Sequence, residues 1–343
     1  MRVVGLSLAM LATVPAFPLH PTSHPAHVFP IRRSIGTPLR ASLTMNARCD
    51  EYAARLSSNK GRWGGRFIGP VVRYLNICLV GLIFGLVMRF LNRFRAIRRK
   101  DFLQHVFRRP KGRGLLTVSN HLSVADDPGL WAALLPWWRM RPEQMRWSLC
   151  TDGVFFANPI IAKVIGAGNV MPLDRMGSLE QPLFKCFLDK LNGGSWTHLF
   201  AEGRVWQEWR FDENEQRLGP FKVGVGKLVA HSMNDPLVVP MYHKGLDKVI
   251  PEKVLTAKRS RKASVPISLI PRVGKNIELY VGHPVSFRNK LEAFDEKHGS
   301  EMRRSWQSTP ELLQLYAEIT NDIREQVLLL EAEAWRRNST VSC

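Results

Sequence analysis

The sequence predicts an α/β fold in which a sheet is flanked by helices and an apolar helix precedes the folded domain. Short β-rich apolar runs alternate with segments of helical periodicity between residues 101 and 290, which is the pattern of an α/β sheet. The hydrophobic and charged contents, 45% and 23%, are those of a globular chain. An apolar run from Phe67 to Met88 comes before this alternation.

Residues 1–48 have the composition of a targeting leader. The apolar start, Met1–Thr13, is too short to span a bilayer, and hydroxyl-rich and basic sequence follows it, with no acid before Asp50. This composition is typical of an organellar transit segment. The apolar start and Ala16-Phe17-Pro18 also resemble the two-part leaders of complex plastids. A tail without a targeting role is the alternative.

Residues 62–100 form the predicted membrane-associated segment. Arg73 and Asn76 interrupt its apolar run and leave Ile77–Met88 uninterrupted, which is shorter than the ~20 residues of a spanning helix. An apolar segment with a basic flank is expected to insert from one face, with its cations on anionic head groups. A buried core helix with a solvated basic edge is the alternative. The basic flank consists of Arg89, Arg93, Arg95, Arg98, Arg99, Lys100, Arg108, Arg109, Lys111 and Arg113.

The predicted α/β domain at 101–290 and the C-terminal segment at 291–343 contain the remaining elements. The Asp127-Pro128 pair is expected to cap the first helix of the domain. Residues 252–275 are rich in Lys, Arg and Pro and are expected to form a surface loop. A long amphipathic helix is expected to begin at Pro310 and reach about Arg336. From short β-rich runs and from helical spacing, strands are expected at 114–119, 196–200, 236–240 and 277–281, and helices at 128–135, 183–191 and 224–230.

The residues that carry chemistry begin with His121, which ends a predicted strand. Asp126 follows five residues later, at a turn into a helix where its carboxylate can fold back onto the imidazole. A carboxylate on one ring nitrogen fixes the tautomer and leaves the other nitrogen free to take a proton from a hydroxyl. The substrate's own hydroxyl would then be the nucleophile. His-x4-Asp alone is a weak signal that chance also produces.

The net charge of +20, from 49 Lys and Arg against 29 Asp and Glu, favours an anionic partner, either nucleic acid or an anionic membrane surface. Nucleic-acid binding needs aromatic or base-reading side chains among the cations. Phe90, Phe94 and Phe102 instead have the spacing of an apolar helix face. An anionic membrane surface is therefore expected, and no nucleic acid. The sequence shows no metal-ligand spacing and no dinucleotide loop, so no cofactor and no metal are expected.

Four motifs follow one another along the chain, at His121–Asp126, Gly168–Arg175, Phe200–Arg204 and Val238–Pro240. In this order they resemble the motifs of the glycerophospholipid acyltransferase family. The resemblance covers roughly residues 62–287 and implies the fold of that family, a central mixed sheet flanked by helices. Details such as Asp126-Asp127-Pro128 and Pro240–Gly245 are similar to the transacylases of the family that remodel cardiolipin by moving acyl chains between phospholipids and lysophospholipids. That likeness implies a mitochondrial membrane, with a plastid membrane as the alternative.

The resemblance implies that His121 and Asp126 are catalytic and that four residues bind the substrate: Arg175, Glu202, Gly203 and Arg204. An arginine suits bidentate recognition of a phosphate. Ala201 stands where the family has a proline. The pair Asp174-Arg175 resembles the acyl-CoA-dependent members, so a lysophosphatidic acid acyltransferase with acyl-CoA as donor is the alternative.

Other features allow less specific interpretations. His198, His231, His243 and His283 have no acid at the His-x4-Asp spacing and are expected to be structural, because a lone histidine is a poor signal. Trp137-Trp138 suits either a head-group interface or the core. A rival of another class is a non-enzymatic basic protein that binds anionic lipid. It accounts for the charge and leaves the four motifs as coincidence.

Overall fold

The computed structural model describes residues 70–151, 159–174, 177–207, 217–255, 263–266 and 270–339. The predicted leader at 1–48 lies outside them, as does the beginning of the predicted membrane-associated segment. All described residues fall in one compact unit, Pro38–Cys343.

The centre of the fold is a sheet that contains seven strands of the described chain, in the order β1-β9-β6-β2-β5-β3-β4. Strands β6, β2, β5, β3 and β4 run parallel, whereas β9 is antiparallel to β6 and parallel to β1. The predicted mixed sheet is confirmed. The strands are β1 (Arg93–Ile97), β2 (Leu115–Ser119), β3 (Trp147–Thr151), β4 (Val170–Leu173), β5 (Trp196–Phe200), β6 (Leu237–Lys244) and β9 (Asn276–Val281).

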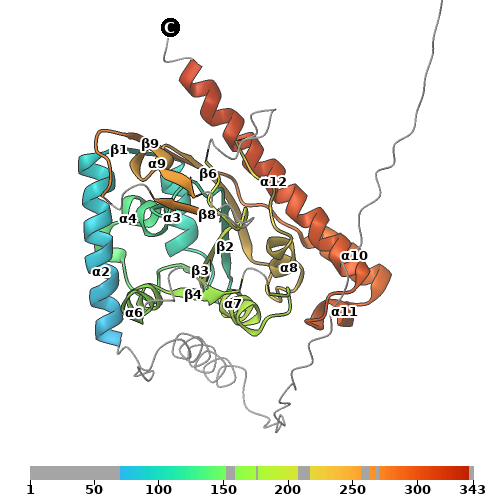
Figure 1. The fold of residues 1–343 in the computed structure, drawn as a ribbon. Coiled ribbons are helices and arrows are strands. Elements are labelled where there is room, and N and C mark those ends of the chain that lie inside the picture. Colours follow the sequence, from blue (N-terminus) through green and yellow to red (C-terminus); the bar gives the residue numbers. More distant parts are fainter. Residues whose placement is uncertain are drawn as a thin grey trace, which may run out of the picture. The chain divides into compact units, whose positions relative to one another are not determined.

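Helices cover both faces of this sheet (Figure 1). Alternate residues of β2 enter different cores: Leu115 packs with α2, α3 and α4, whereas Leu116 and Val118 pack with α7, α8 and α12, as the two-residue period of a strand requires. The larger helices are α2 (Pro70–Leu86), α3 (Arg99–Phe107), α4 (Asp126–Leu134), α6 (Pro159–Ala167), α7 (Pro182–Asn192), α8 (Gly224–Ala230), α10 (Arg288–His298) and α12 (Pro310–Ser339). Short helical segments lie at η1 (Val87–Leu91), η2 (Trp137–Arg139), α9 (Leu246–Val249) and α11 (Ser300–Arg304).

The central strands and the helices predicted from the sequence agree closely with the structure, and the omissions lie at the edges. Strand β1 carries exposed Arg93 and Arg95 on the edge of the sheet, so a basic cluster conceals its alternation. The predicted loop at 252–275 is wrong in part, because β7 (Glu252–Leu255) and β8 (Ala263–Pro266) pair as an antiparallel ribbon there.

Helix α2 continues into η1, and together Val71–Leu91 give 21 residues that are long and apolar enough to cross a membrane, the one such helix in the described chain. The two interruptions seen in the sequence face the protein. Arg73 donates to the side chain of Asn169, and Asn76 Nδ2 donates to the Val164 carbonyl at 3.0 Å. The opposite face is exposed and apolar, at Val71, Val72, Leu75, Leu79, Leu82, Ile83 and Leu86.

The cations that follow α2 divide into two groups. Arg89 donates to the carbonyls of Ala133 and Leu135, and Arg99 to that of Leu134, which satisfies the C-terminal carbonyls of α4. Three further arginines also bind inside the protein: Arg98, Arg109 and Arg113. The remaining cations are exposed, at Arg93, Arg95, Lys100, Arg108 and Lys111. This second group is the part of the predicted basic flank that is exposed to solvent.

Candidate active site

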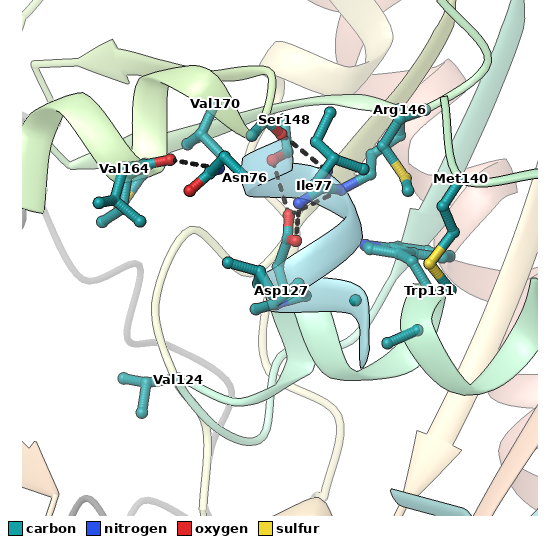
Figure 2. Close-up of a pocket in the computed structure, with 18 of the residues that line it drawn as sticks. Asn76, Ile77, Val124, Asp127, Trp131, Met140, Arg146, Ser148, Val164 and Val170 are labelled. Carbon is teal, nitrogen blue, oxygen red and sulfur yellow. Dashed lines mark hydrogen bonds and ion pairs between the residues drawn. The ribbon is translucent and has the colours of Figure 1, made fainter. Parts of the chain in front are cut away.

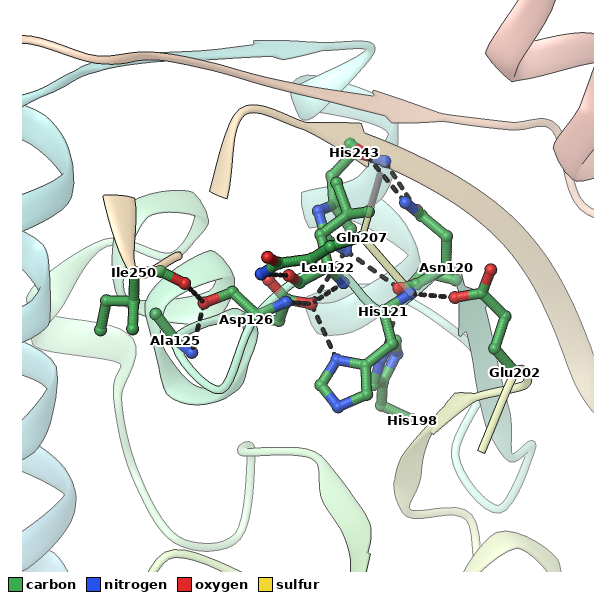
Figure 3. A network of polar contacts seen from close by, with 12 residues as sticks. Asn120, His121, Leu122, Ala125, Asp126, His198, Glu202, Gln207, His243 and Ile250 are labelled. Carbon is green, nitrogen blue, oxygen red and sulfur yellow. Dashed lines mark hydrogen bonds and ion pairs between the residues drawn. The ribbon is translucent and has the colours of Figure 1, made fainter. Parts of the chain in front are cut away.

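His121 and Asp126 are brought together at the carboxyl end of β2. The His121 Nδ1 atom lies 2.8 Å from Asp126 Oδ2, with the histidine side chain 21% exposed and the aspartate fully buried. The same carboxylate oxygen accepts the backbone N–H groups of Leu122 at 2.6 Å and Ser123 at 3.0 Å. Because this oxygen only accepts, Nδ1 carries the proton and Nε2 is left as an acceptor. The predicted pair therefore has the geometry of an oriented general base (Figure 3).

Glu202 lies beneath the His121 backbone. The Phe200–Gly203 turn, closed by the Gly203 N–H to the Phe200 carbonyl at 3.0 Å, directs its side chain inward, where it is 2% exposed. Its two oxygens accept the N–H groups of His121 and Gly219, each at 2.6 Å. Burial raises the pKa of Glu202 to about 8, and the two N–H donors oppose that rise. The carboxyl thus joins the loop before α8 to the backbone of His121.

The other predicted substrate-binding residues are placed less fully. Gly203 has φ of +65°, a left-handed conformation that favours glycine, and both Gly203 and Arg204 are exposed at this turn. The chain then passes close to the first motif, where the Trp206 N–H donates to the His121 carbonyl at 2.7 Å. Arg175 lies outside the described residues.

An apolar pocket of about 190 Å³ opens beside His121. Its walls come from α2, α4, α6 and the strands β3 and β4, so residues far apart in the sequence share it (Figure 2). The α2 wall is the face opposite its exposed apolar side and includes Asn76, Ile77, Val80 and Gly81. A pocket with apolar walls and a histidine among its lining residues suits a hydrocarbon chain that carries a polar group.

One ion pair interrupts the apolar walls of this pocket. Asp127 forms a salt bridge with the buried Arg146 and accepts the Ser148 hydroxyl at 2.7 Å. Arg146 also donates to the Gly168 carbonyl at 2.8 Å. The helix-start signal of Asp127-Pro128 is confirmed in the backbone, because Asp127 has the extended angles of a residue that precedes a helix. The expected side-chain cap is not seen, since both carboxylate oxygens contact Arg146 and one of them also accepts from Ser148. The Asp127 carboxylate instead ties α4 to β3.

Two polar residues lie next to the pair: Asn120, which received no role from the sequence, and His243, which was expected to be structural. Asn120 and His243 exchange two hydrogen bonds of 2.9 Å: the His243 N–H donates to Asn120 Oδ1, and Asn120 Nδ2 donates to the His243 carbonyl. The position of Asn120 next to His121 is the only signal that the sequence offered for this contact. In the part of the chain that the structure describes, no group of His, Cys, Asp and Glu side chains could hold a metal ion.

Comparison with known proteins places the chain among lipid-modifying enzymes. A family model described as Acyltransferase matches residues 97–244. An N-acylphosphatidylethanolamine synthase of Arabidopsis thaliana is 32% identical over 66% of this chain and 75% of its own length. The tafazzin of Drosophila melanogaster is 32% identical over 64% of this chain and 53% of its own.

A third relative and one solved structure also match the chain. The Dictyostelium discoideum relative named taffazin is 34% identical over 52% of this chain and 55% of its own length, so the chain spans about half the length of these two tafazzins. A crystal structure of the lysophosphatidic acid acyltransferase PlsC from Thermotoga maritima matches with a TM-score of 0.41 and 15% identity, over 79% of this chain and 98% of that one. The motifs, the mixed sheet and these relatives together show that the chain belongs to the glycerophospholipid acyltransferase family, is an acyltransferase, and falls in the group that contains the tafazzins.

Proposed function

We propose that this enzyme transfers fatty acyl groups between phospholipids and lysophospholipids, with His121 as general base and Asp126 as its orienting carboxylate. The observation that carries the proposal is that His121, which is paired with Asp126, lines the apolar pocket. The protein supplies no nucleophile of its own in this reaction, since the acceptor hydroxyl fulfils that role.

The reaction moves one acyl group from the donor to the acceptor and one proton in the opposite direction. Nε2 of His121 takes the proton of the acceptor hydroxyl, and the oxygen attacks the acyl carbonyl of the donor ester. The tetrahedral intermediate collapses by breaking the bond to the donor's oxygen, which receives the proton back from His121. Asp126 stabilises the transient imidazolium through its 2.8 Å contact with Nδ1.

The polar head of the acceptor is proposed to lie at the exposed turn of Gly203 and Arg204, together with Arg175. Guanidinium groups suit a phosphodiester. For Glu202, burial and two backbone partners favour a role through the His121 backbone over direct contact with the head group. Its predicted substrate binding stays a prediction.

The acyl acceptor has a second candidate. The Arabidopsis relative carries the name of an N-acylphosphatidylethanolamine synthase, so an amine is an acceptor to be tested beside the hydroxyl. A histidine base serves either, because both nucleophiles lose a proton on acylation.

The deciding experiment mixes the purified enzyme with labelled lysophospholipid, phosphatidylethanolamine and diacyl phospholipid, with and without acyl-CoA. We expect a new diacyl product without acyl-CoA, and its loss in His121→Ala. N-acylated product identifies the amine reaction, and dependence on acyl-CoA identifies the lysophosphatidic acid acyltransferase alternative. Full activity in His121→Ala contradicts the assignment of the base.

We further propose that α2 lies in the plane of the membrane surface and does not cross it. Its inner face packs on the domain along its length: Arg73 contacts Asn169 near one end, Gly81 lies against Met140, and Arg89 reaches Ala133 near the other end. A crossing helix would carry this polar domain into the hydrocarbon, at a large cost for its charges. An in-plane helix buries only its apolar face.

The exposed Trp137 and Trp138, at 71% and 61% exposure, lie on η2 beside α2, where tryptophans suit a head-group interface. Vesicle flotation tests this arrangement. We expect Ile83→Asp or Trp138→Ala to weaken binding to anionic vesicles, and Met233→Asp to leave it unchanged, since Met233 follows α8 on the other layer and is also exposed. Equal binding by all three variants contradicts it.

The proposal extends to cardiolipin as a substrate and to a mitochondrial membrane as location, both supported by the likeness to tafazzins. A fluorescent fusion of residues 1–60 distinguishes mitochondrion from plastid. Cardiolipin composition in cells that lack the gene tests the substrate.

A further inference from the structure

His243 is a buried histidine on β6, and none of the proposed reaction steps involves it. It is fully buried and makes three hydrogen bonds of 2.9 Å with Asn120, two through its backbone and one from its ring Nε2 to the Asn120 carbonyl. That carbonyl belongs to the residue immediately before His121.

The side chain of Asn120 extends the pairing of β2 and β6. The strands pair as far as Ser119 and Met241, and beyond that point the Asn120 amide takes the place of a strand backbone by accepting from His243 N–H and donating to its carbonyl. The main chain at residue 121 is thereby free to leave the sheet, while the residue before it stays fixed to β6.

The imidazole of His243 also lies close to Asp126, on the side of its carboxylate away from His121. Its Nε2 atom lies 3.5 Å from Asp126 Oδ2, the same oxygen that contacts His121 Nδ1 at 2.8 Å. Since a carbonyl oxygen only accepts, Nε2 carries the hydrogen in the bond to Asn120. The positive end of this N–H dipole therefore lies beside the carboxylate, opposite His121 (Figure 3).

We propose that His243 is a positioning residue for the His121–Asp126 pair. It fixes the Asn120 carbonyl and places a neutral N–H dipole against the far side of the Asp126 oxygen. This inference rests on the proposed function, since it assigns His243 to the same reaction.

A neutral state suits this role. Burial lowers the pKa of His243, against opposing contributions from Asp126 and from the Asn120 carbonyl. A charged imidazolium there would compete with His121 for the single carboxylate, whereas a neutral ring leaves that charge for His121. Two other titratable neighbours also shift the pKa of His243: His121 lowers it and Asp247 raises it. Arg146 lowers the pKa of the nearby buried His198. Glu202 accepts the backbone N–H groups of His121 and Gly219.

Two amide substitutions, His243→Gln and His243→Asn, distinguish this positioning role from a role in packing alone. The amide nitrogen of His243→Gln can reach the position of Nε2, and that of His243→Asn reaches only the position of Nδ1. We expect Gln to keep kcat within about threefold and Asn to lower it about 10- to 100-fold with little change in KM, as for a displacement of the reacting group. In Asn the acid limb of the pH profile should move to higher pH, because the unshielded carboxylate holds the His121 imidazolium more strongly.

His231→Gln and His231→Asn are the matched controls. His231 is also a buried histidine, and it lies in the layer across the sheet. Its two ring nitrogens are hydrogen-bonded to the Arg303 carbonyl and to Tyr316. Both control variants should keep the wild-type acid limb. The imidazole NMR signals of His121, titrated in each variant, give the same readout without turnover.

The possible results distinguish the positioning role of His243 from the proposed acyl transfer itself. An inactive wild-type enzyme or a fully active His121→Ala overturns the proposed function, and the NMR titration then decides the inference alone. A His243→Asn variant with wild-type kcat and an unmoved titration overturns the inference. So does an equal loss in His243→Gln and His243→Asn with the titration unmoved, which would show packing only.

Discussion

Asp126→Asn separates the charge of the orienting carboxylate from its geometry. One oxygen, Oδ2, accepts the ring N–H of His121 and the backbone N–H groups of Leu122 and Ser123, while Oδ1 is buried without a hydrogen-bond partner among the described residues. The two backbone N–H groups hold an oxygen in the Oδ2 position. The amide nitrogen of Asn therefore takes the Oδ1 position, and the three hydrogen bonds persist without the negative charge.

The magnitude follows from the contact distance. With Nδ1 and Oδ2 2.8 Å apart, the charge centres of the imidazolium and the carboxylate are roughly 4 Å apart, for which the attraction is about 4 kcal/mol at an effective dielectric constant of about 20. At about 1.4 kcal/mol per factor of ten, loss of this attraction should lower kcat about a thousandfold. KM should change little, because the charge acts on the transition state.

The assay is initial-rate acyl transfer with vesicle substrates, corrected for folded protein by circular dichroism. Asp127→Asn is the comparison, since Asp127 is the adjacent acid and pairs with Arg146, not with His121. If Asp126→Asn is folded and keeps more than a tenth of wild-type kcat, the carboxylate charge does not support the base and this reasoning is refuted.

Four other outcomes are expected. Asp127→Asn should lower the free energy of unfolding by about 3 kcal/mol, because the buried Arg146 loses its counter-charge; unchanged urea denaturation would contradict this. Gly226→Ala should lower Tm, because its Cβ would lie 2.0 Å from the Tyr316 carbonyl of α12; an unaltered Tm would show that α12 can move away. Gly81→Leu should reduce transfer of long acyl chains about tenfold more than of short ones, since Gly81 lines the pocket against Met140; equal effects on both lengths would remove the pocket as the chain site. Because burial raises the pKa of Glu202 from 4.5 to about 8, the folded chain holds more protons than the unfolded chain in that window, and stability should fall as pH rises through it. Urea denaturation at several pH values should show this slope flattened in Glu202→Gln, at a constant cost of about 1–3 kcal/mol for one backbone N–H that faces the new amide.

The sequence alone determined the central strands and the orienting pair. All five residues of β2 are buried, and so are the first three of β5. Their apolar, β-rich composition therefore identifies both as strands without tertiary information. His121 and Asp126 are five residues apart, and a turn between a strand and a helix suffices to bring them together. The motif resemblance led to the same family that the relatives show.

Only the tertiary structure decided which side chains support that pair. Glu202 meets His121 and His243 meets Asn120 across 81 and 123 positions of sequence, because the registers of β2 with β5 and β6 bring their carboxyl ends together. Asp127 pairs with Arg146 although its Asp-Pro context favours a cap, since contact with a buried cation outweighs a local preference. The direction in which α2 turns Arg73 and Asn76 is likewise set by packing on α6 and the chain before β4, which an apolar run in the sequence does not encode.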